Sequence, residues 1–535
     1  MTQTNSTLLA IMLFLAGCGD TDKSADTGEW DGDDGTPADD DPSDQDADAD
    51  ADGDDTGTGG DDTGTDDGPF NATDGPCADG GWGTITDPAT THHFWGGNES
   101  NSIDGAESLG DMNAPFTSWN DLEAARTADP NLVITAIGLW GGEHTIPTAA
   151  ITEFATNNIP VLGCGSAEVL ITLDAGAGAD PEAPLIAVGM GMEATLNGLE
   201  LHGTGTSPVV SVTDGGSATL ADMQIVAGVG APILKAEGNA ILEVTGSVLA
   251  GGTTGIWTSG GTSSLTLNNV EISSPQGAGI WTSGGTSSLI DVQISGVTAM
   301  PGITSGVGGW GIVANGGDLV AHNVTVDGAV GAGLVAAVDG VVSIKDVTIQ
   351  NISGSSEGNW GRGIYIEGIG ASGYVNMDTV TVDNVYETGI FIQDLGSTDL
   401  QNITMTNVHS HTSFYGEPVG GDGLVIVQTN EDDATIDPSV VSAQLLGSNS
   451  FTGITRAGII AHGSHLQLTV PMDLEAGDER DGTSIFSQGY GVVEFVSGSD
   501  GGDDTGTPSS GLVTECGSDD SYDLDCDGFD FSSSP

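Results

Sequence analysis

The chain has 535 residues, of which 86 are glycine, and it carries 7 Lys and Arg but 78 Asp and Glu, for a net charge of −71. A chain of this length exceeds what one ordinary core organises, so several domains or a repeat are expected. Nucleic-acid binding needs Lys and Arg to neutralise phosphates, which excludes nucleic acid as a partner. The same acidity keeps a surface protein hydrated and repels polyanions unless cations screen the contact.

A short apolar run from Leu8 to Ala16 comes first. It is too short to span a bilayer and has the length of a signal-peptide core. The run ends in LAGC at residues 15–18, which resembles the lipobox of bacterial lipoproteins, although Met1–Thr7 lack the usual Lys or Arg. The resemblance implies that residues 1–18 are a lipoprotein signal and that Cys18 receives a lipid. The protein would then be anchored to a membrane outside the cytoplasm, at the outer membrane or cell surface.

Residues 19–81 are rich in Asp, Gly and Thr, as in the stretch DGDDGTPADDD. This composition buries no apolar surface and its charges repel one another. We therefore expect a disordered, extended tether that spaces the following body from the membrane.

The body is repetitive. Gly255–Leu265 and Gly279–Leu289 both read GIWTSGGTSSL, at an offset of 24 residues. In each unit a short Gly-Ile strand leads to a Gly-rich turn and then to an alternating strand of the type Leu-x-x-Val-x-Ile. Units this short cannot bury an apolar face alone, so they must stack on their neighbours. Weaker copies begin at Pro184, Pro208, Ala231, Gly311, Gly333, Gly363 and Gly389.

A helix precedes the repeats. Ser118 is suited to cap its N-terminus, with Asp121 three residues later. With the repeats, this start resembles the pectate-lyase-like family of right-handed parallel β-helix proteins. We expect an all-β solenoid of about a dozen coils over residues 82–498, with a short N-terminal capping helix over the open end of the stack. The family includes enzymes and noncatalytic surface proteins, so the fold alone does not define the activity.

Asn residues recur near the second strand of each unit. Asn tolerates left-handed turns, so we expect these residues to be structural and to stack from coil to coil. They are Asn268, Asn269, Asn323, Asn384, Asn402 and Asn407.

Catalytic groups of the kind found in the family's enzymes are sparse. The basic residues of the repeat body are Lys235, Lys345, Arg362 and Arg456, which leaves few candidates for a lyase base. Glu367 and Asp394 fall at similar positions of adjacent coils, a spacing compatible with the two carboxylates of a glycosidase. We treat both as weak catalytic candidates, and ordinary solvent-facing positions remain the alternative.

Three coils carry extra residues before their Gly-Ile strand, which predicts loops on one edge of the stack. Aromatic planes beside polar groups suit sugar stacking and hydrogen bonding, so these loops are the candidate ligand site. The candidate residues are Trp310, Trp360, Arg362, His409, His411, Tyr415, Glu417 and Asp422.

Residues 499–535 form an acidic tail. Asp523, Asp525, Asp527 and Asp530 have the alternate spacing of calcium loops, so the tail is either a Ca²⁺ site or merely solvated. Four cysteines remain outside the signal, and an even number permits two disulfides with three possible pairings. We favour Cys516 with Cys526 and Cys77 with Cys164.

Three functions remain open. The first expectation is a noncatalytic, lipid-anchored surface protein that binds glycans, matrix or a surface protein through its loop-decorated edge. The second is an extracellular polysaccharide lyase or glycoside hydrolase that acts on the same face. The third is a structural spacer.

Overall fold

The structure is a computed structural model, and it describes residues 91–96, 119–147, 153–174, 184–203, 206–300, 308–354, 361–368, 373–412, 418–428, 441–470, 472–476, 485–488, 492–497 and 513–515. Chain contacts divide the protein into two units, and every described element belongs to the unit Phe70–Phe529. Within these ranges the chain is nearly all parallel strand with few helices, and the predicted parallel β-helix is confirmed. No helix among these residues is long and apolar enough to cross a membrane.

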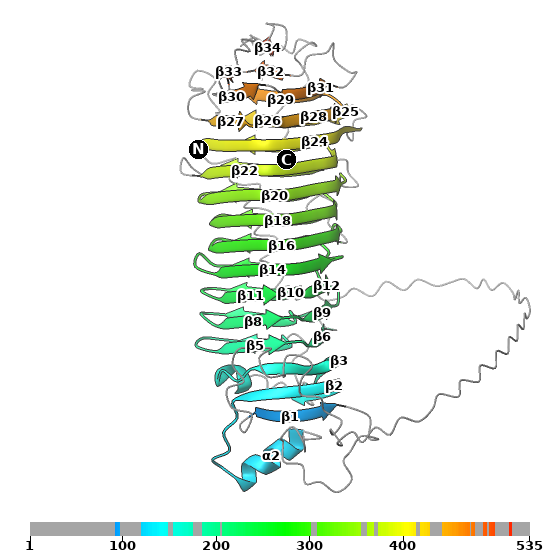
Figure 1. Cartoon of the computed structure of the whole chain (residues 1–535), viewed down its shortest axis with the longest axis vertical. Coiled ribbons are helices and arrows are strands. Elements are labelled where there is room, and N and C mark those ends of the chain that lie inside the picture. The colour runs from blue at the N-terminus through cyan, green and yellow to red at the C-terminus, as the bar shows by residue number, and fades with distance from the viewer. Residues whose placement is uncertain are drawn as a thin grey trace, which may run out of the picture. The chain divides into compact units, whose positions relative to one another are not determined.

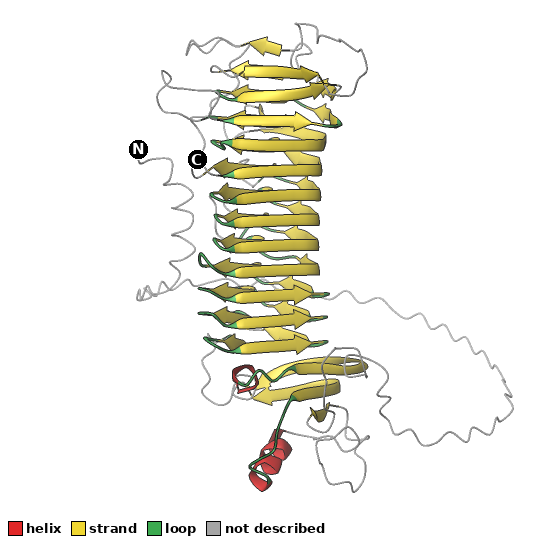
Figure 2. Ribbon diagram, turned by 60° about the vertical axis from the view of Figure 1, so that its left-hand side comes forward, coloured by secondary structure: helices red, strands yellow, loops and turns green. Residues whose placement is uncertain are grey.

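Two sheets run along the stack, and from β4 onward the described coils alternate between them, whereas β1, β2 and β3 belong to the larger sheet alone (Figures 1 and 2). In the described part of the chain the smaller sheet has 13 parallel strands, close to the dozen coils expected. In stacking order they are β4 (Ile186–Val188), β7 (Val210–Thr213), β10 (Pro232–Glu237), β13 (Thr254–Ser259), β15 (Ala278–Ser283), β17 (Trp310–Asn315), β19 (Ala332–Val338), β21 (Arg362–Gly368), β23 (Thr388–Gln393), β26 (Asp422–Val427), β29 (Ala457–His462), β32 (Ile485–Gln488) and β34 (Val513–Glu515).

The larger sheet has 21 strands among the described residues. All of its pairings are parallel except that of β25, a short antiparallel strand beside β24. Its members are β1 (Thr91–Gly96), β2 (Ala136–Pro147), β3 (Val161–Asp174), β5 (Glu193–Asn197), β6 (Glu200–Gly203), β8 (Ser217–Ala221), β9 (Gln224–Ala227), β11 (Ile241–Thr245), β12 (Val248–Gly251), β14 (Ser264–Ser273), β16 (Thr286–Val297), β18 (Asp318–Ala329), β20 (Val341–Ile352), β22 (Tyr374–Tyr386), β24 (Ser397–Thr412), β25 (Pro418–Gly420), β27 (Ser442–Leu446), β28 (Asn449–Ile454), β30 (His465–Val470), β31 (Met472–Ala476) and β33 (Val492–Ser497).

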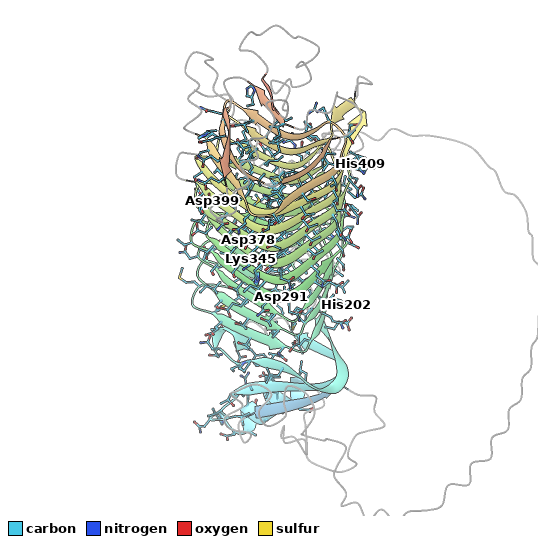
Figure 3. The ribbon with its side chains drawn as sticks, turned by 45° about the horizontal axis from the view of Figure 1, so that its top comes forward. His202, Asp291, Lys345, Asp378, Asp399 and His409 are labelled. Atoms are coloured by element: carbon cyan, nitrogen blue, oxygen red, sulfur yellow. The ribbon has the colours of Figure 1, made fainter. Side chains whose placement is uncertain are left out.

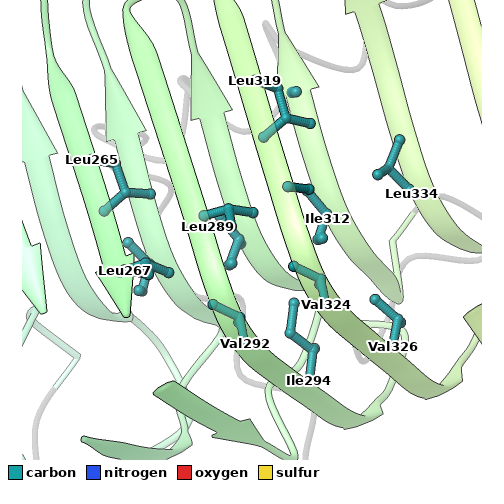
Figure 4. Packing of buried hydrophobic residues seen from close by; sticks show 14 of the residues in the cluster. Leu265, Leu267, Leu289, Val292, Ile294, Ile312, Leu319, Val324, Val326 and Leu334 are labelled. Carbon is teal, nitrogen blue, oxygen red and sulfur yellow. The ribbon is translucent and has the colours of Figure 1, made fainter. Parts of the chain in front are cut away.

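Alternating apolar residues of both sheets fill the interior (Figure 4). Successive side chains of a strand point to opposite faces, so every second residue is inward. In β14 the inward Leu265 and Leu267 are 1% and 0% exposed, and Ile312 of β17 packs in the same cluster. Each buried aliphatic side chain contributes about 1.5–3 kcal/mol, so the stack is held by its apolar interior.

The long strands of the larger sheet bend at residues in the left-handed conformation. In β14 the alternation breaks at Asn269, whose φ is 53°, and this explains the Leu-x-x-Val spacing read from the sequence. The left-handed turn predicted at these Asn residues is confirmed for five of the six, and Asn268 lacks a positive φ. Those with positive φ are Asn269, Asn323, Asn384, Asn402 and Asn407.

The two identical segments stack with two different registers. Trp257 pairs with Trp281 at the expected offset of 24 residues, but Leu267 pairs with Leu289 at an offset of 22. The four residues between β13 and β14 form a longer turn than the two between β15 and β16. A shift of two residues keeps every side chain on its own face, so both coils remain compatible with the core.

Both ends of the stack differ from the sequence expectation in detail. The predicted helix is α2 (Trp119–Ala128), and its Leu122 is 1% exposed in the core cluster. Strand β1 precedes α2 and pairs with β2, so one strand is added before the helix. At the other end β34 pairs with β32, which extends the smaller sheet into the segment expected as the tail.

Candidate functional site

Two columns of outward side chains run along the smaller sheet, because the strands stack in register. The first column is Lys235, Trp257, Trp281, Val313, Val335, Tyr365, Phe391, Val425 and Ile460. The second column lies two residues later in each strand and is Glu237, Ser259, Ser283, Asn315, Ala337, Glu367, Gln393, Val427 and His462. An apolar, partly aromatic column therefore lies beside a mainly polar one.

Polar side chains meet where the columns cross β21 and β23, and we name Tyr365, Glu367, Gln393 and Asp394 the carboxylate cluster. Glu367 is in register with Gln393, and Asp394 follows directly. The Tyr365 hydroxyl lies 3.3 Å from Glu367 Oε2 and 3.4 Å from Gln393 Oε1, so its single proton is shared between two acceptors. The Gln393 amide donates to Asp394 Oδ2 at 3.4 Å. The two carboxylates predicted from the sequence therefore belong to one hydrogen-bonded group.

The surroundings of the carboxylate cluster raise the pKa of Glu367. Burial raises the pKa of Glu367 above its ordinary value, and the charge of Asp394 raises it further, against a lowering by the Tyr365 hydrogen bond. Burial and the charge of Glu367 also hold the pKa of Tyr365 well above its usual range, so this hydroxyl remains a donor. A carboxyl group whose pKa is raised beside a second carboxylate is the arrangement that divides acid and base roles.

The backbone holds Asp394 in place. Asp394 has a φ of 52° and its N–H donates to the Val427 carbonyl at 2.9 Å. The next side chain, Leu395, is fully buried in the core. A Cβ at Gly368 would lie 2.2 Å from the Asp394 carbonyl oxygen, so glycine is needed for this close approach. The turn that carries Asp394 is thus anchored on both sides.

Arg362 covers the aromatic part of the cluster. Its guanidinium carbon lies 4.9 Å from the Tyr365 ring centroid and 4.6 Å from that of Phe391. The same guanidinium donates to Glu387 Oε1 from Nε at 2.9 Å and from Nη2 at 2.6 Å. Tyr365 and Phe391 are consequently only 7% and 6% exposed. Arg362, predicted as a loop residue, is instead the first residue of β21.

The other predicted ligand residues lie on different elements. Trp310 begins β17 rather than ending a loop, and it is only 6% exposed, with its ring 5.6 Å from that of Trp281. Asp422 begins β26, is 2% exposed and forms an ion pair with Arg456. His409 lies in β24 of the larger sheet, with its ring 5.3 Å from the Tyr386 ring. Asp422, His409 and Arg362 meet around Glu387, because the Glu387 N–H donates to the His409 carbonyl at 2.9 Å and the Asp422 N–H donates to the Glu387 carbonyl at 3.1 Å. Trp310 lies two strands from Arg362 along the smaller sheet.

Several predicted residues lie outside what the structure describes. The side chains of His411 and Cys164 are not described, although both residues fall in strands. Outside the described ranges are Cys18, Cys77, Trp360, Tyr415, Glu417, Cys516, Asp523, Asp525, Cys526, Asp527 and Asp530. Within the described ranges, no group of three or more His, Cys, Asp or Glu side chains is placed to hold a metal ion.

Sequence reasoning missed two neighbours of the predicted carboxylates, Tyr365 and Gln393, and also Glu387, the partner of Arg362. The repeat pattern could have indicated Tyr365, because this residue follows Gly-Ile just as Trp257 and Trp281 do. An aromatic residue recurring at an outward position points to a column on one face. Glu387 was detectable only from the charge of Arg362 one coil earlier.

No protein-family profile and no curated protein matches this sequence. Among solved structures, the chain is similar to the catalytic domain of a GH87 α-1,3-glucanase in complex with nigerose, with 12% identity, a TM-score of 0.30, and 75% of this chain and 66% of that chain covered. It is also similar to the catalytic unit of a thermostable GH87 α-1,3-glucanase from Streptomyces thermodiastaticus, with 13% identity, a TM-score of 0.32, and 72% and 70% covered. The Azotobacter vinelandii mannuronan C-5 epimerase A-module has 10% identity and a TM-score of 0.21, with 71% and 95% covered. These likenesses concern the arrangement of strands, and no chemistry is carried over from them.

Proposed function

We propose that this protein is a polysaccharide hydrolase in which Glu367 is the proton donor and Asp394 is the second carboxylate. The observation that carries the proposal is the raised pKa of Glu367 beside the charge of Asp394. Glycoside hydrolysis needs one carboxyl group to protonate the leaving oxygen and a second to assist attack at the anomeric carbon. This support favours the enzyme over the noncatalytic surface protein that was first expected.

In the proposed reaction the C–O bond between two sugar units breaks and the elements of water are added. Glu367 gives its proton to the leaving oxygen. Asp394 acts at the anomeric carbon, either directly or through a water molecule. Tyr365 donates a hydrogen bond to Glu367 and orients it.

Hydrolysis fits this site better than elimination. A polysaccharide lyase needs a base, and Arg or Lys is the candidate for that role in this chain. Arg362 is the basic side chain at this cluster, and its guanidinium is bonded to Glu387 and stacked on two rings. These contacts give Arg362 a structural role at the cluster.

The substrate that we propose is a neutral polysaccharide. The chain carries a net charge of −71, which disfavours the approach of a polyanion such as a uronate polymer. An extracytoplasmic location, proposed from the lipobox at Cys18, is where such a polymer would be met. The anchor and location rest on the sequence alone.

The test is the release of reducing ends from a panel of soluble neutral glucans of different linkage, measured from pH 4 to pH 9. We expect activity that falls on the alkaline side as Glu367 loses its proton, and a decrease of about 10²–10⁴-fold in Glu367→Gln. Asp394→Asn should be similarly impaired. Glu271→Gln, at an exposed position of β14 on the larger sheet, is the matched control and should retain full activity.

Two results would count against this proposal. One is the absence of product from every glucan with the unaltered protein. The other is product formation that survives both Glu367→Gln and Asp394→Asn, which would place the chemistry elsewhere.

A further inference from the structure

Two tryptophans lie on the same outward column as the carboxylate cluster. Trp257 of β13 and Trp281 of β15 are in register and only partly buried, whereas the column from Val313 to Ile460 is nearly covered, with exposures of 0–7%. Their partial exposure matters because indole rings are costly to leave in water unless they contact a ligand. The identical GIWTS segments of the repeat thus present two partly exposed indoles at the same position of neighbouring strands.

Neighbouring side chains hold these rings from both sides. Lys235 Nζ lies 4.8 Å from the Trp257 ring centroid, and it forms an ion pair with Glu237 at 2.9 Å. On the other side the buried Trp310 lies 5.6 Å from Trp281, with an interplanar angle of 42°. The rings are therefore supported in place, and the charge of Lys235 is neutralised by Glu237.

Hydroxyl and amide groups line the rings in the second column. Ser259 and Ser283 are in register with each other, and Asn315 follows on β17. All three are partly exposed, and the Asn315 amide donates to the Ser283 hydroxyl at 3.5 Å. A face with flat apolar rings on one side and uncharged hydrogen-bonding groups on the other matches a neutral sugar ring.

The distances from Trp257 and Trp281 to Glu367 of the carboxylate cluster can be spanned by one polysaccharide chain. From β15 the sheet passes through β17 and β19 to β21, so Trp281 lies three strands from Glu367 and Trp257 lies four. At about 4.8 Å for each strand, these separations are about 14 and 19 Å. A sugar unit of an extended polysaccharide advances by about one strand spacing. A chain lying along the two columns would therefore reach both places.

We propose that Trp257 and Trp281 form a sugar-stacking platform for the neutral polysaccharide, three to four strands from Glu367. This inference rests on the proposed function, since it assigns the platform to the same substrate. The platform favours long chains over short ones and directs cleavage to internal bonds. If these rings instead bound a protein, the rate of cleavage would not depend on the length of the sugar chain through Trp257 and Trp281.

The first measurement is affinity electrophoresis in gels that contain the same neutral glucans, using the full chain with Glu367→Gln to prevent cleavage. Retardation by at least one glucan is expected. Adding Trp257→Ala and Trp281→Ala should weaken binding about 10-fold, because both ring contacts with the sugar are lost. Tyr386→Ala removes an aromatic side chain that is 37% exposed on the larger sheet, and it should leave binding unchanged.

The second measurement compares substrates of different length in the wild-type background. Trp257→Ala with Trp281→Ala should lower kcat/KM about 10-fold on polymeric glucan and leave that on a trisaccharide unchanged. The paired Trp→Phe variants keep a ring and should retain most binding, which separates lost stacking from lost folding. Thermal melting monitors the fold of each variant.

Each result decides between the two proposals. Unchanged retardation in the double Ala variant, or an equal loss on polymer and trisaccharide, would overturn the platform. No retardation by any neutral glucan would do the same. Retardation that depends on the two tryptophans, together with no cleavage by the unaltered protein, would support the platform and overturn the hydrolase.

Discussion

On the larger sheet, carboxylates of one coil accept hydrogen bonds from amides of the next, whereas on the smaller sheet Glu367 is placed beside Asp394. The first arrangement repeats along the stack, from Asn351 to Asp327 at 2.6 Å and from Asn402 to Asp378 at 2.9 Å. Asp291, which accepts from the Asn323 amide at 2.5 Å, and Asp378 lie on the outer surface of the larger sheet (Figure 3). The second arrangement raises the pKa of Glu367. Stacking in register thus satisfies hydrogen bonds where donors meet acceptors and raises a carboxyl pKa where two acids meet.

The largest change is expected in the amide series. Asn402→Ala removes the bond to Asp378 and the one that the Ser448 N–H donates to Asn402 Oδ1 at 3.1 Å, and it places Ala at a φ of 55°. We expect the free energy of unfolding to fall by about 2–3 kcal/mol, measured by urea denaturation. Asn376→Ala, at an exposed position of β22, is the control and should change it by less than about 0.5 kcal/mol. Equal effects at the two positions would mean that the amide series is not stabilising.

The carboxylate cluster should respond in the opposite direction. Glu367→Gln removes a charge that is disfavoured by burial and by Asp394. We expect the free energy of unfolding at pH 7 to rise by about 1 kcal/mol, because one unit of pKa shift corresponds to about 1.4 kcal/mol. Glu271→Gln should be neutral in the same urea titration. A loss of stability in Glu367→Gln would show that the cluster is a structural element.

The smallest effect is a difference in pH dependence between the two regions. Hydrogen bonds from Thr406 and then Asn407 lower the pKa of Asp383, so its stabilisation is present above the unfolded pKa and is lost as pH falls through the folded pKa. The raised pKa of Glu367 acts the other way: its stabilisation is present below the unfolded pKa and is lost as pH rises through the folded pKa.

Urea midpoints between pH 3 and pH 8 would separate these two contributions. The urea midpoint of Asp383→Asn should fall further below that of the unaltered protein as pH rises. The urea midpoint of Glu367→Gln should rise further above that of the unaltered protein as pH rises. Differences that stay constant across the range would mean that neither carboxyl group changes its pKa on folding.

Most of the fold was predictable because its information is periodic. The offset between Trp257 and Trp281, the inward Leu267 and the left-handed Asn269 all follow from spacing and residue type. The position of Glu367 beside Asp394 was also accessible, since register places equivalent residues of neighbouring coils together.

The surroundings of the site were less accessible. Trp310 was expected on a loop for stacking on a ligand, but it begins β17 and packs on Trp281. Asp422 was expected to face a ligand, but it is buried against Arg456. In both cases the partner comes from another coil at an irregular separation in sequence, and the repeat pattern does not specify which outward residues are covered.

The two identical segments with different turns have a consequence for how such a protein can lengthen. Gly255–Leu265 and Gly279–Leu289 have the same sequence, yet their second strands stack with a shift of two residues. A newly duplicated coil therefore need not reproduce its parent's geometry in order to fit. A shift of two residues leaves each side chain on the inner or outer face that it already had. A duplicated coil that is two residues longer or shorter in its turn can therefore still stack, and the turns can vary in length while the apolar interior stays the same.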